Sequence, residues 1–200
     1  MLQEVGVQKR KGRSASGWVL SGLLDQAMSA LSVEARSQVD LVILKGDGGK
    51  QAWIPRAFIT KVQMKLVPEN VRGTTTYRAK VPEEGRKRSA KEVLPWETYE
   101  LAGVSRVELT SYQERLGSHF LKRRTDPAAL RGEKLFVQNC LACHFSTLPQ
   151  WRQQGQGFGE NFSRLGSRHG SQDWLGGLDE RNSRALISYW NAWLAEPGNR

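Results

Sequence analysis

The chain of 200 residues contains only two cysteines, and both lie in one short segment, Cys140-Leu-Ala-Cys143-His144. A framework of several disulfides therefore cannot form, and an apolar core must hold the fold together. Apolar residues make up 38% of the chain, which is sufficient for such a core. The pattern C-x-x-C-H is thus the strongest constraint on what this chain folds around.

This spacing is typical of covalent haem attachment, because one helical turn offers two thiols to the vinyl groups and the next imidazole to the iron. Two reduced core cysteines beside an incidental histidine are the plainest alternative. A thioredoxin-like pair needs a βαβ context, which the sequence lacks. A zinc site with Cys140, Cys143 and His144 or His169 is unfavourable, because adjacent residues reach one tetrahedral ion poorly. We predict one haem c at Cys140 and Cys143, with His144 as the axial ligand.

The basic residues are concentrated in the first part of the chain. Residues 1–125 hold 22 basic and 13 acidic side chains (22 − 13 = +9), whereas residues 126–200 hold 8 and 7 (+1). The excess favours an acidic or phosphate-bearing partner. Helix-turn-helix, zinc-finger and RNA-binding patterns are absent, so nucleic acid is not predicted. Hydrolase motifs, including Gly-rich phosphate loops and Ser/His/Asp signatures, are absent as well.

Hydropathy predicts no membrane span in this chain. Crossing a bilayer takes about 20 apolar residues, and the best candidate, residues 18–24, is followed at once by Asp25. The basic start, residues 1–14, lacks the apolar core and cleavage site of a signal peptide. We infer that a leader has been removed or that the start codon is misplaced.

Periodicity and turn residues predict an α+β domain over residues 1–125. A helix is expected at 17–32 and a hairpin from strands 41–44 and 52–55, joined by the turn 46–49. Loops around a weak strand at 75–81 are expected in residues 68–94. A last strand at 104–109 and a charged linker at 111–125 complete this part.

Residues 126–200 are predicted to form a small all-α domain. Asp126 and Pro127 are a typical helix start, since Asp caps free N–H groups and Pro loses no hydrogen bond at the first position. This helix should run into Cys140, and loops should follow as far as residue 159. A short helix at 171–175 and a final helix, capped by Asp179 and ended by Pro197, are expected.

Residues 126–200 resemble a small class I cytochrome c domain. Gly132-Glu-Lys-Leu-Phe136 is similar to that family's first helix, and Leu186-Ile-Ser-Tyr189-Trp190 is similar to its last. The resemblance implies that Gly132 lets the two helices approach closely and that Phe136 packs against Tyr189 or Trp190 beside the haem. It also implies electron transfer in the periplasm, because that family receives its haem outside the cytoplasm.

The sixth iron ligand departs from the family pattern. A methionine downstream of the haem motif is usual there, but the three methionines of this chain all precede it: Met1, Met28 and Met64. His169 is our first choice, with His119 and Met64 as alternatives. Two imidazoles would lower the reduction potential, because a thioether favours Fe(II). An open sixth position would instead indicate a haem sensor or a peroxidase-like enzyme.

Residues 18–31, 41–48 and 52–55 resemble part of the sulfite oxidase-type molybdopterin-binding fold. A cysteine thiolate usually holds the molybdenum in that family, whereas both cysteines here are assigned to haem. We therefore interpret residues 1–125 as a docking module without molybdenum. The predicted protein is a monohaem c-type cytochrome, or a subunit of an oxidoreductase complex, rather than an enzyme by itself. Its predicted partner is an acidic redox protein or a molybdenum enzyme.

Overall fold

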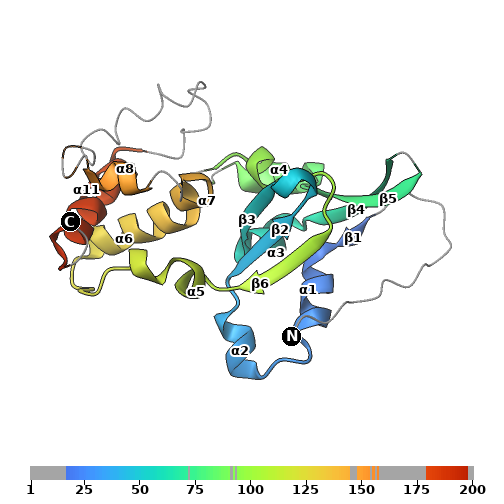
Figure 1. The fold of residues 1–200 in the computed structure, drawn as a ribbon, viewed down its shortest axis with the longest axis horizontal. Coiled ribbons are helices and arrows are strands. Elements are labelled where there is room, and N and C mark those ends of the chain that lie inside the picture. The colour runs from blue at the N-terminus through green and yellow to red at the C-terminus, as the bar shows by residue number, and fades with distance from the viewer. Residues whose placement is uncertain are drawn as a thin grey trace. The chain divides into compact units, whose positions relative to one another are not determined.

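The computed structural model describes residues 17–71, 73–90, 92, 94–144, 148–153, 155, 157 and 179–197. The fold is mixed α and β, as predicted, with two three-stranded sheets. The chain divides into two compact units (Figure 1). The first comprises Met1–Arg88 and Tyr99–Leu109, and the second comprises Ser89–Thr98 and Thr110–Arg200.

One sheet of the first unit has the order β3-β2-β6, from Gln51–Pro55, Leu41–Lys45 and Arg106–Thr110. Strands β2 and β3 pair antiparallel, with Leu41 opposite Pro55 and Lys45 opposite Gln51. The tight turn between them is possible because Gly48 and Gly49 take positive φ angles of 66° and 76°. The predicted hairpin is confirmed.

The other sheet has the order β1-β4-β5, from Trp18–Val19, Lys65–Val71 and Thr74–Lys80. Strand β4 was not predicted, because it contains Pro68, which cannot donate to a ladder. Among the described residues, β1 pairs with Lys65 and Leu66, and Pro68 pairs with Tyr77 on β5 alone, so no described strand calls on its missing N–H on the β1 side. The weak strand expected at 75–81 corresponds to β5.

Helices α1 (Leu20–Met28) and α3 (Arg56–Val62) contribute to the apolar core of the first unit. Met28 and Met64 are buried in it, at 1% and 0% exposure. The helix expected at 17–32 is shorter than predicted, because Trp18 and Val19 pair with β4 instead. The remaining elements of this region are α2 (Val33–Gln38), η1 (Asp47–Gly49) and α4 (Glu83–Ser89).

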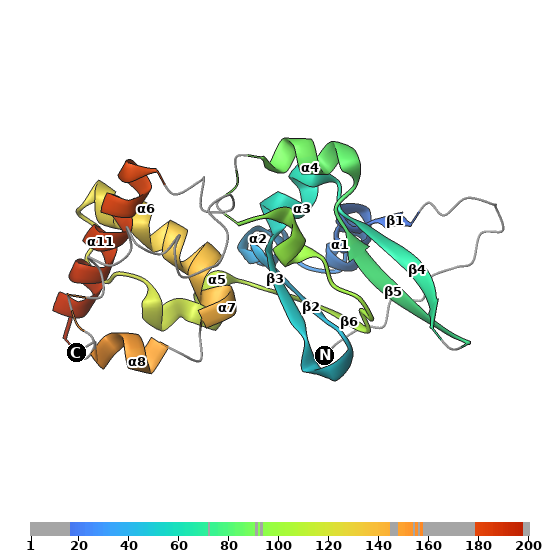
Figure 2. The same ribbon diagram turned by 90° about the horizontal axis from the view of Figure 1, so that it is seen from above.

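The second unit is helical where it is described. After η2 (Trp96–Tyr99), which ends in the first unit, come α5 (Tyr112–Leu116), η3 (Gly117–His119), α6 (Pro127–Leu135), η4 (Phe136–Cys140), α7 (Leu141–His144), α8 (Leu148–Gln153) and α11 (Glu180–Ala195). Helices α6 and α11 pack side by side, as Figures 1 and 2 both show. The predicted caps are confirmed, because Asp126 Oδ1 accepts from Ala128 N–H and Asp179 Oδ1 from Asn182 N–H.

The boundary expected at Thr125 falls inside the second unit, whose longer segment runs from Thr110 to Arg200. The later part of the expected linker, residues 118–124, is hydrogen-bonded to α6 and to α11 with its C-cap Glu196. The Tyr189 hydroxyl donates to His119 O at 2.7 Å, and Leu121 N–H donates to Glu133 Oε2 at 2.6 Å. Charge and turn residues suggested an exposed connection, whereas these tertiary bonds attach the segment to α6 and α11.

Two expectations concern the region after His144. The loops predicted there are interrupted by α8, which Pro149 favours because it lies near the helix start, where its missing N–H costs nothing. The short helix expected at 171–175 lies outside the described residues. Among the residues that are described, no helix has the length and apolar character required to cross a membrane.

Candidate functional site

The crossing of α6 and α11 depends on a glycine. A Cβ atom built on Gly132 would lie 1.9 Å from the carbonyl oxygen of Ala185 and 2.7 Å from Tyr189 Cβ. Any larger side chain would therefore collide with the backbone of α11. The predicted close approach at Gly132 is confirmed as a packing contact.

Aromatic side chains fill the space beside this crossing. The ring of Phe136 lies 5.1 Å from that of Tyr189 and 5.7 Å from that of Trp190, centroid to centroid. Trp193 continues the cluster, 5.3 Å from Trp190. All four side chains are buried. The structure thus brings Phe136, Tyr189 and Trp190 together, while their contact with a haem stays a prediction.

The backbone from Phe136 to His144 is helical throughout, so the whole C-x-x-C-H segment lies on helix. Its first part, η4, is a π-helical turn that ends at Cys140, and α7 continues from Leu141. The Asn139 side-chain amide donates to Leu135 O at 2.8 Å and braces this turn. Cys140 and His144 are half-buried, and a separation of four helical positions puts them on one face. The side chain of Cys143 lies outside the described part of the structure.

His144 has an aromatic neighbour that the sequence did not predict. The Trp151 ring, from α8, lies 4.9 Å from the imidazole and 5.9 Å from Phe136. The Leu148-Pro149 pair, a typical helix start, was the available signal for this helix. Trp151, Phe136 and the buried Leu141 and Leu148 therefore give the motif an apolar environment.

The described side chains around the motif include an imidazole and aromatic rings, which are the kinds of group that a covalently held haem requires. Within the residues that the structure describes, no three His, Cys, Asp or Glu side chains gather to bind an ion. A zinc site needs about four such ligands, whereas a haem iron takes one or two axial ligands from the protein and needs apolar walls. Cys140, His144 and the aromatic cluster satisfy that second requirement.

The candidates for a sixth ligand occupy different places. Met64, together with Met28, is buried in the core of the first unit. His119 is buried in the second unit, stacked 5.8 Å from Trp193, with Nδ1 3.1 Å from Ser118 Oγ. Burial lowers the pKa of His119, and the positive charge of Arg152 lowers it further. His169 lies outside the described residues.

No protein-family model, curated protein or solved structure matches this chain. The two resemblances noted in the sequence therefore stay predictions. Arguments about function rest on the chain's own residues and their contacts.

Buried acidic residues are the part of this unit that sequence reasoning missed. Glu133 is 2% exposed and forms an ion pair with Arg124 at 2.8 Å, and Glu196, 6% exposed, accepts from the Lys122 backbone N–H at 2.6 Å. No pattern reveals them, because glutamate on a helix is normally exposed. Between them they hold residues 121–124 against α6 and the end of α11.

Tyr189 connects the aromatic cluster to the segment that contains residues 121–124. Its hydroxyl bonds to a buried carbonyl, and burial raises its pKa well above the usual value, with the acidic groups of Glu133, Cys140 and Glu196 adding to the effect. Tyr189 therefore acts as a neutral hydrogen-bond donor. It fixes α11 against the segment that carries His119.

Proposed function

We propose that the chain is a monohaem c-type cytochrome that transfers single electrons between redox partners. The haem would be thioether-linked to Cys140 and Cys143, with His144 as an axial ligand. The observation that carries this proposal is the C-x-x-C-H spacing on one continuous helical segment, next to a glycine-mediated helix crossing and its aromatic cluster. A bound haem would supply an iron that cycles between Fe(II) and Fe(III).

The chain's own residues would position and insulate this group. The half-buried imidazole of His144 lies on the same helical face as Cys140. Buried Phe136 and Trp190 present apolar surface and exclude water, which lowers the local polarity and so affects the reduction potential. The Trp190 indole N–H donates to Gly155 O at 2.7 Å, which ties this wall to the chain after α8.

The decisive experiment is expression of the full chain in a host that matures c-type cytochromes. We expect a coloured protein whose mass includes one porphyrin, and whose pyridine haemochrome spectrum is that of two thioether bonds. Cys140→Ala and Cys143→Ala should each leave a single thioether and shift that spectrum. Colourless wild-type protein without added mass would refute the proposal.

Carbon monoxide separates an electron carrier from the second candidate, a haem sensor or peroxidase-like enzyme. The absence of a methionine after the motif is the observation that keeps this candidate open. A stable low-spin spectrum that is lost in His169→Ala supports the carrier and a second imidazole. Rapid binding of carbon monoxide to the reduced wild-type protein indicates an open position and favours the sensor or enzyme.

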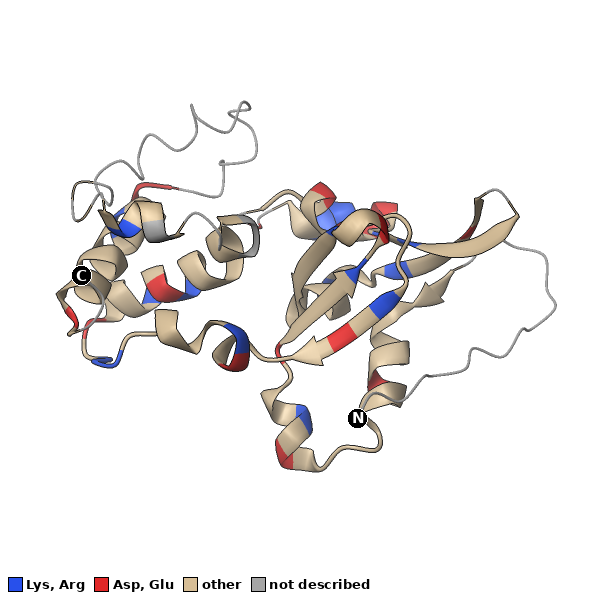
Figure 3. Cartoon of the chain, in the orientation of Figure 1, with Lys and Arg blue, Asp and Glu red and all other residues tan. Residues whose placement is uncertain are grey.

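We also propose an acidic redox protein, or a molybdenum enzyme, as the partner, and a periplasmic location. The basic run at residues 86–88 is weak support for docking of an acidic partner. Figure 3 shows acidic and basic residues together on α4. There Lys87 Nζ lies 3.7 Å from Glu84 and 3.9 Å from Glu83. The Arg86 guanidinium lies 3.8 Å from Glu100. Local carboxylates therefore offset much of the charge of residues 86–88.

A further inference from the structure

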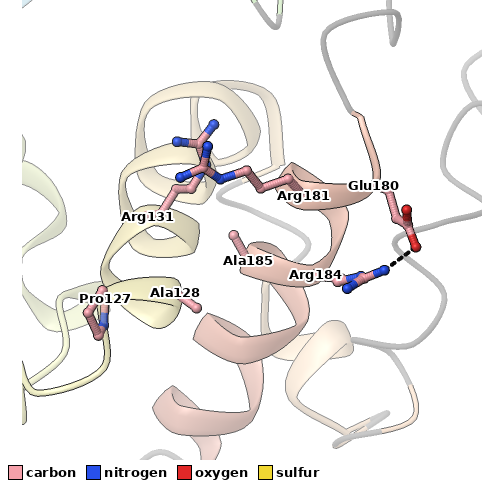
Figure 4. A pocket seen from close by; sticks show the side chains of 7 residues that line it. All are labelled: Pro127, Ala128, Arg131, Glu180, Arg181, Arg184 and Ala185. Atoms are coloured by element: carbon pink, nitrogen blue, oxygen red, sulfur yellow. Dashed lines mark hydrogen bonds and ion pairs between the residues drawn. The ribbon is translucent and has the colours of Figure 1, made fainter.

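A pocket of about 440 Å³ opens beside the amino-terminal ends of α6 and α11, away from the haem motif in sequence. Its floor is formed by small residues, Ala128 and Ala185. Three arginines line it, Arg131 from α6 and Arg181 and Arg184 from α11, together with one carboxylate, Glu180. The lining thus carries three positive charges and one negative charge (Figure 4).

The Arg131 side chain is held in place by hydrogen bonds to an uncharged partner. Its Nε and Nη2 atoms donate to Asn182 Oδ1 at 3.0 and 2.7 Å. Asn182 is 7% exposed, and its backbone N–H is fixed by Asp179 Oδ1. Because the acceptor is an uncharged amide, Arg131 keeps its full charge while its plane is held in place. Such preorganisation reduces the entropic cost of binding an anion.

Arg181 reaches toward Arg131 in the pocket (Figure 4). No carboxylate pairs with it among the described residues. Two like charges repel unless an anion lies between them, and a guanidinium offers parallel N–H donors that match the oxygens of phosphate or carboxylate. Arg184 pairs with Glu180 on the helix surface, where both side chains are more than two thirds exposed. Such an exposed ion pair contributes little free energy, so Arg184 can exchange it for a contact with an anion.

We propose that this pocket binds a phosphate dianion, either free or as a phosphate monoester, through Arg131, Arg181 and Arg184. Two further carboxylates lie at the helix starts, but their Oδ1 atoms accept backbone N–H groups: Asp126 from Ala128 and Asp179 from Asn182. They moderate the local positive charge without occupying the guanidinium groups. The site is independent of the haem and of electron transfer.

The test is titration of the purified full-length protein with inorganic phosphate at constant ionic strength in chloride. Calorimetry measures the dissociation constant, and the melting temperature measures the stabilisation by bound phosphate. We expect saturable binding that Arg181→Gln weakens by about tenfold or more, since a charge-assisted bidentate contact is lost. Arg181→Lys should recover only part of the affinity, because it restores the charge but not the planar fork. Glycerol 3-phosphate, titrated in parallel, distinguishes a monoester site from a site for the free ion.

Arg123→Gln is the matched control, because it removes the same charge from an exposed residue of the same unit outside the pocket. It should change phosphate affinity by less than about twofold, because Arg123 does not line the pocket and salt screens the charge of an exposed side chain. The proposal is wrong if the wild-type protein shows no saturable binding, or if Arg123→Gln and Arg181→Gln weaken it equally. The latter result would reflect only the overall charge of +10. Unchanged melting of Arg181→Gln without phosphate would show that its fold is intact.

Discussion

Replacing Gly132 by alanine should separate α6 from α11. The new Cβ would lie 1.9 Å from the Ala185 carbonyl oxygen, whereas a carbon and an oxygen in contact lie about 3.3 Å apart. The helices must therefore move apart by about 1.4 Å at this point. The obstacle is backbone on the opposite helix, so a change of side-chain rotamer cannot relieve the collision.

The expected loss of stability in Gly132→Ala is the sum of opposing contributions. Overpacking against a helix costs about 1–3 kcal/mol and more where backbone must move, and loosening of the contact between Phe136 and Tyr189 adds about 0.5–1.5 kcal/mol. The higher helix propensity of alanine returns about 1 kcal/mol. We expect a net loss of about 0.5–3.5 kcal/mol in the free energy of unfolding of the second unit, towards the upper end because backbone must move.

Urea unfolding followed by tryptophan fluorescence measures this loss, and near-ultraviolet circular dichroism reports the packing of Trp190 and Trp193. Gly22→Ala is the control, because Gly22 lies inside α1 and a Cβ there meets nothing within 4 Å. That change should stabilise the first unit by about 0.5–1 kcal/mol. If Gly132→Ala were as stable as the wild type with an unaltered aromatic spectrum, the close packing of α6 on α11 would be wrong.

Three further predictions concern buried polar groups of the second unit. Glu133→Ala should lower the free energy of unfolding by about 1–3 kcal/mol, because the buried Leu121 N–H loses its acceptor, whereas the half-exposed Arg124 charge is rehydrated. Glu133→Gln, which keeps an acceptor, should lose less in the same urea assay. Tyr189→Phe should lower the free energy of unfolding by about 1–3 kcal/mol, because it removes the buried hydrogen bond to the His119 carbonyl. In the wild type, an ultraviolet titration should detect no ionisation of Tyr189 near its usual pKa of 10.0. Because the pKa of His119 is lowered from 6.5 in the folded state, the unfolded chain binds more protons below that pH, so stability should fall as the pH drops below 6.5. His119→Gln should flatten this part of the stability profile, and an equally steep profile in that variant would assign the effect to other groups.

Local signals in the sequence predicted several elements because their causes are local. The hairpin of β2 and β3 follows from two β-rich runs around a glycine turn, and the starts of α6 and α11 follow from Asp126 and Asp179. Strand β4 could not be predicted in this way. Its Pro68 argues against a strand, and only the tertiary pairing of Lys65–Val71 with β5 reveals one.

For the candidate site, the sequence by itself determined the position of the C-x-x-C-H motif through the spacing of its residues, and the resemblance to cytochrome c domains predicted close packing at Gly132. The tertiary structure alone decided that Trp151 lies against His144, that residues 111–124 belong to the second unit, and that three arginines share one pocket. The physical reason is that these contacts join segments far apart in the chain. No propensity or periodicity within a segment specifies which distant surface it will meet.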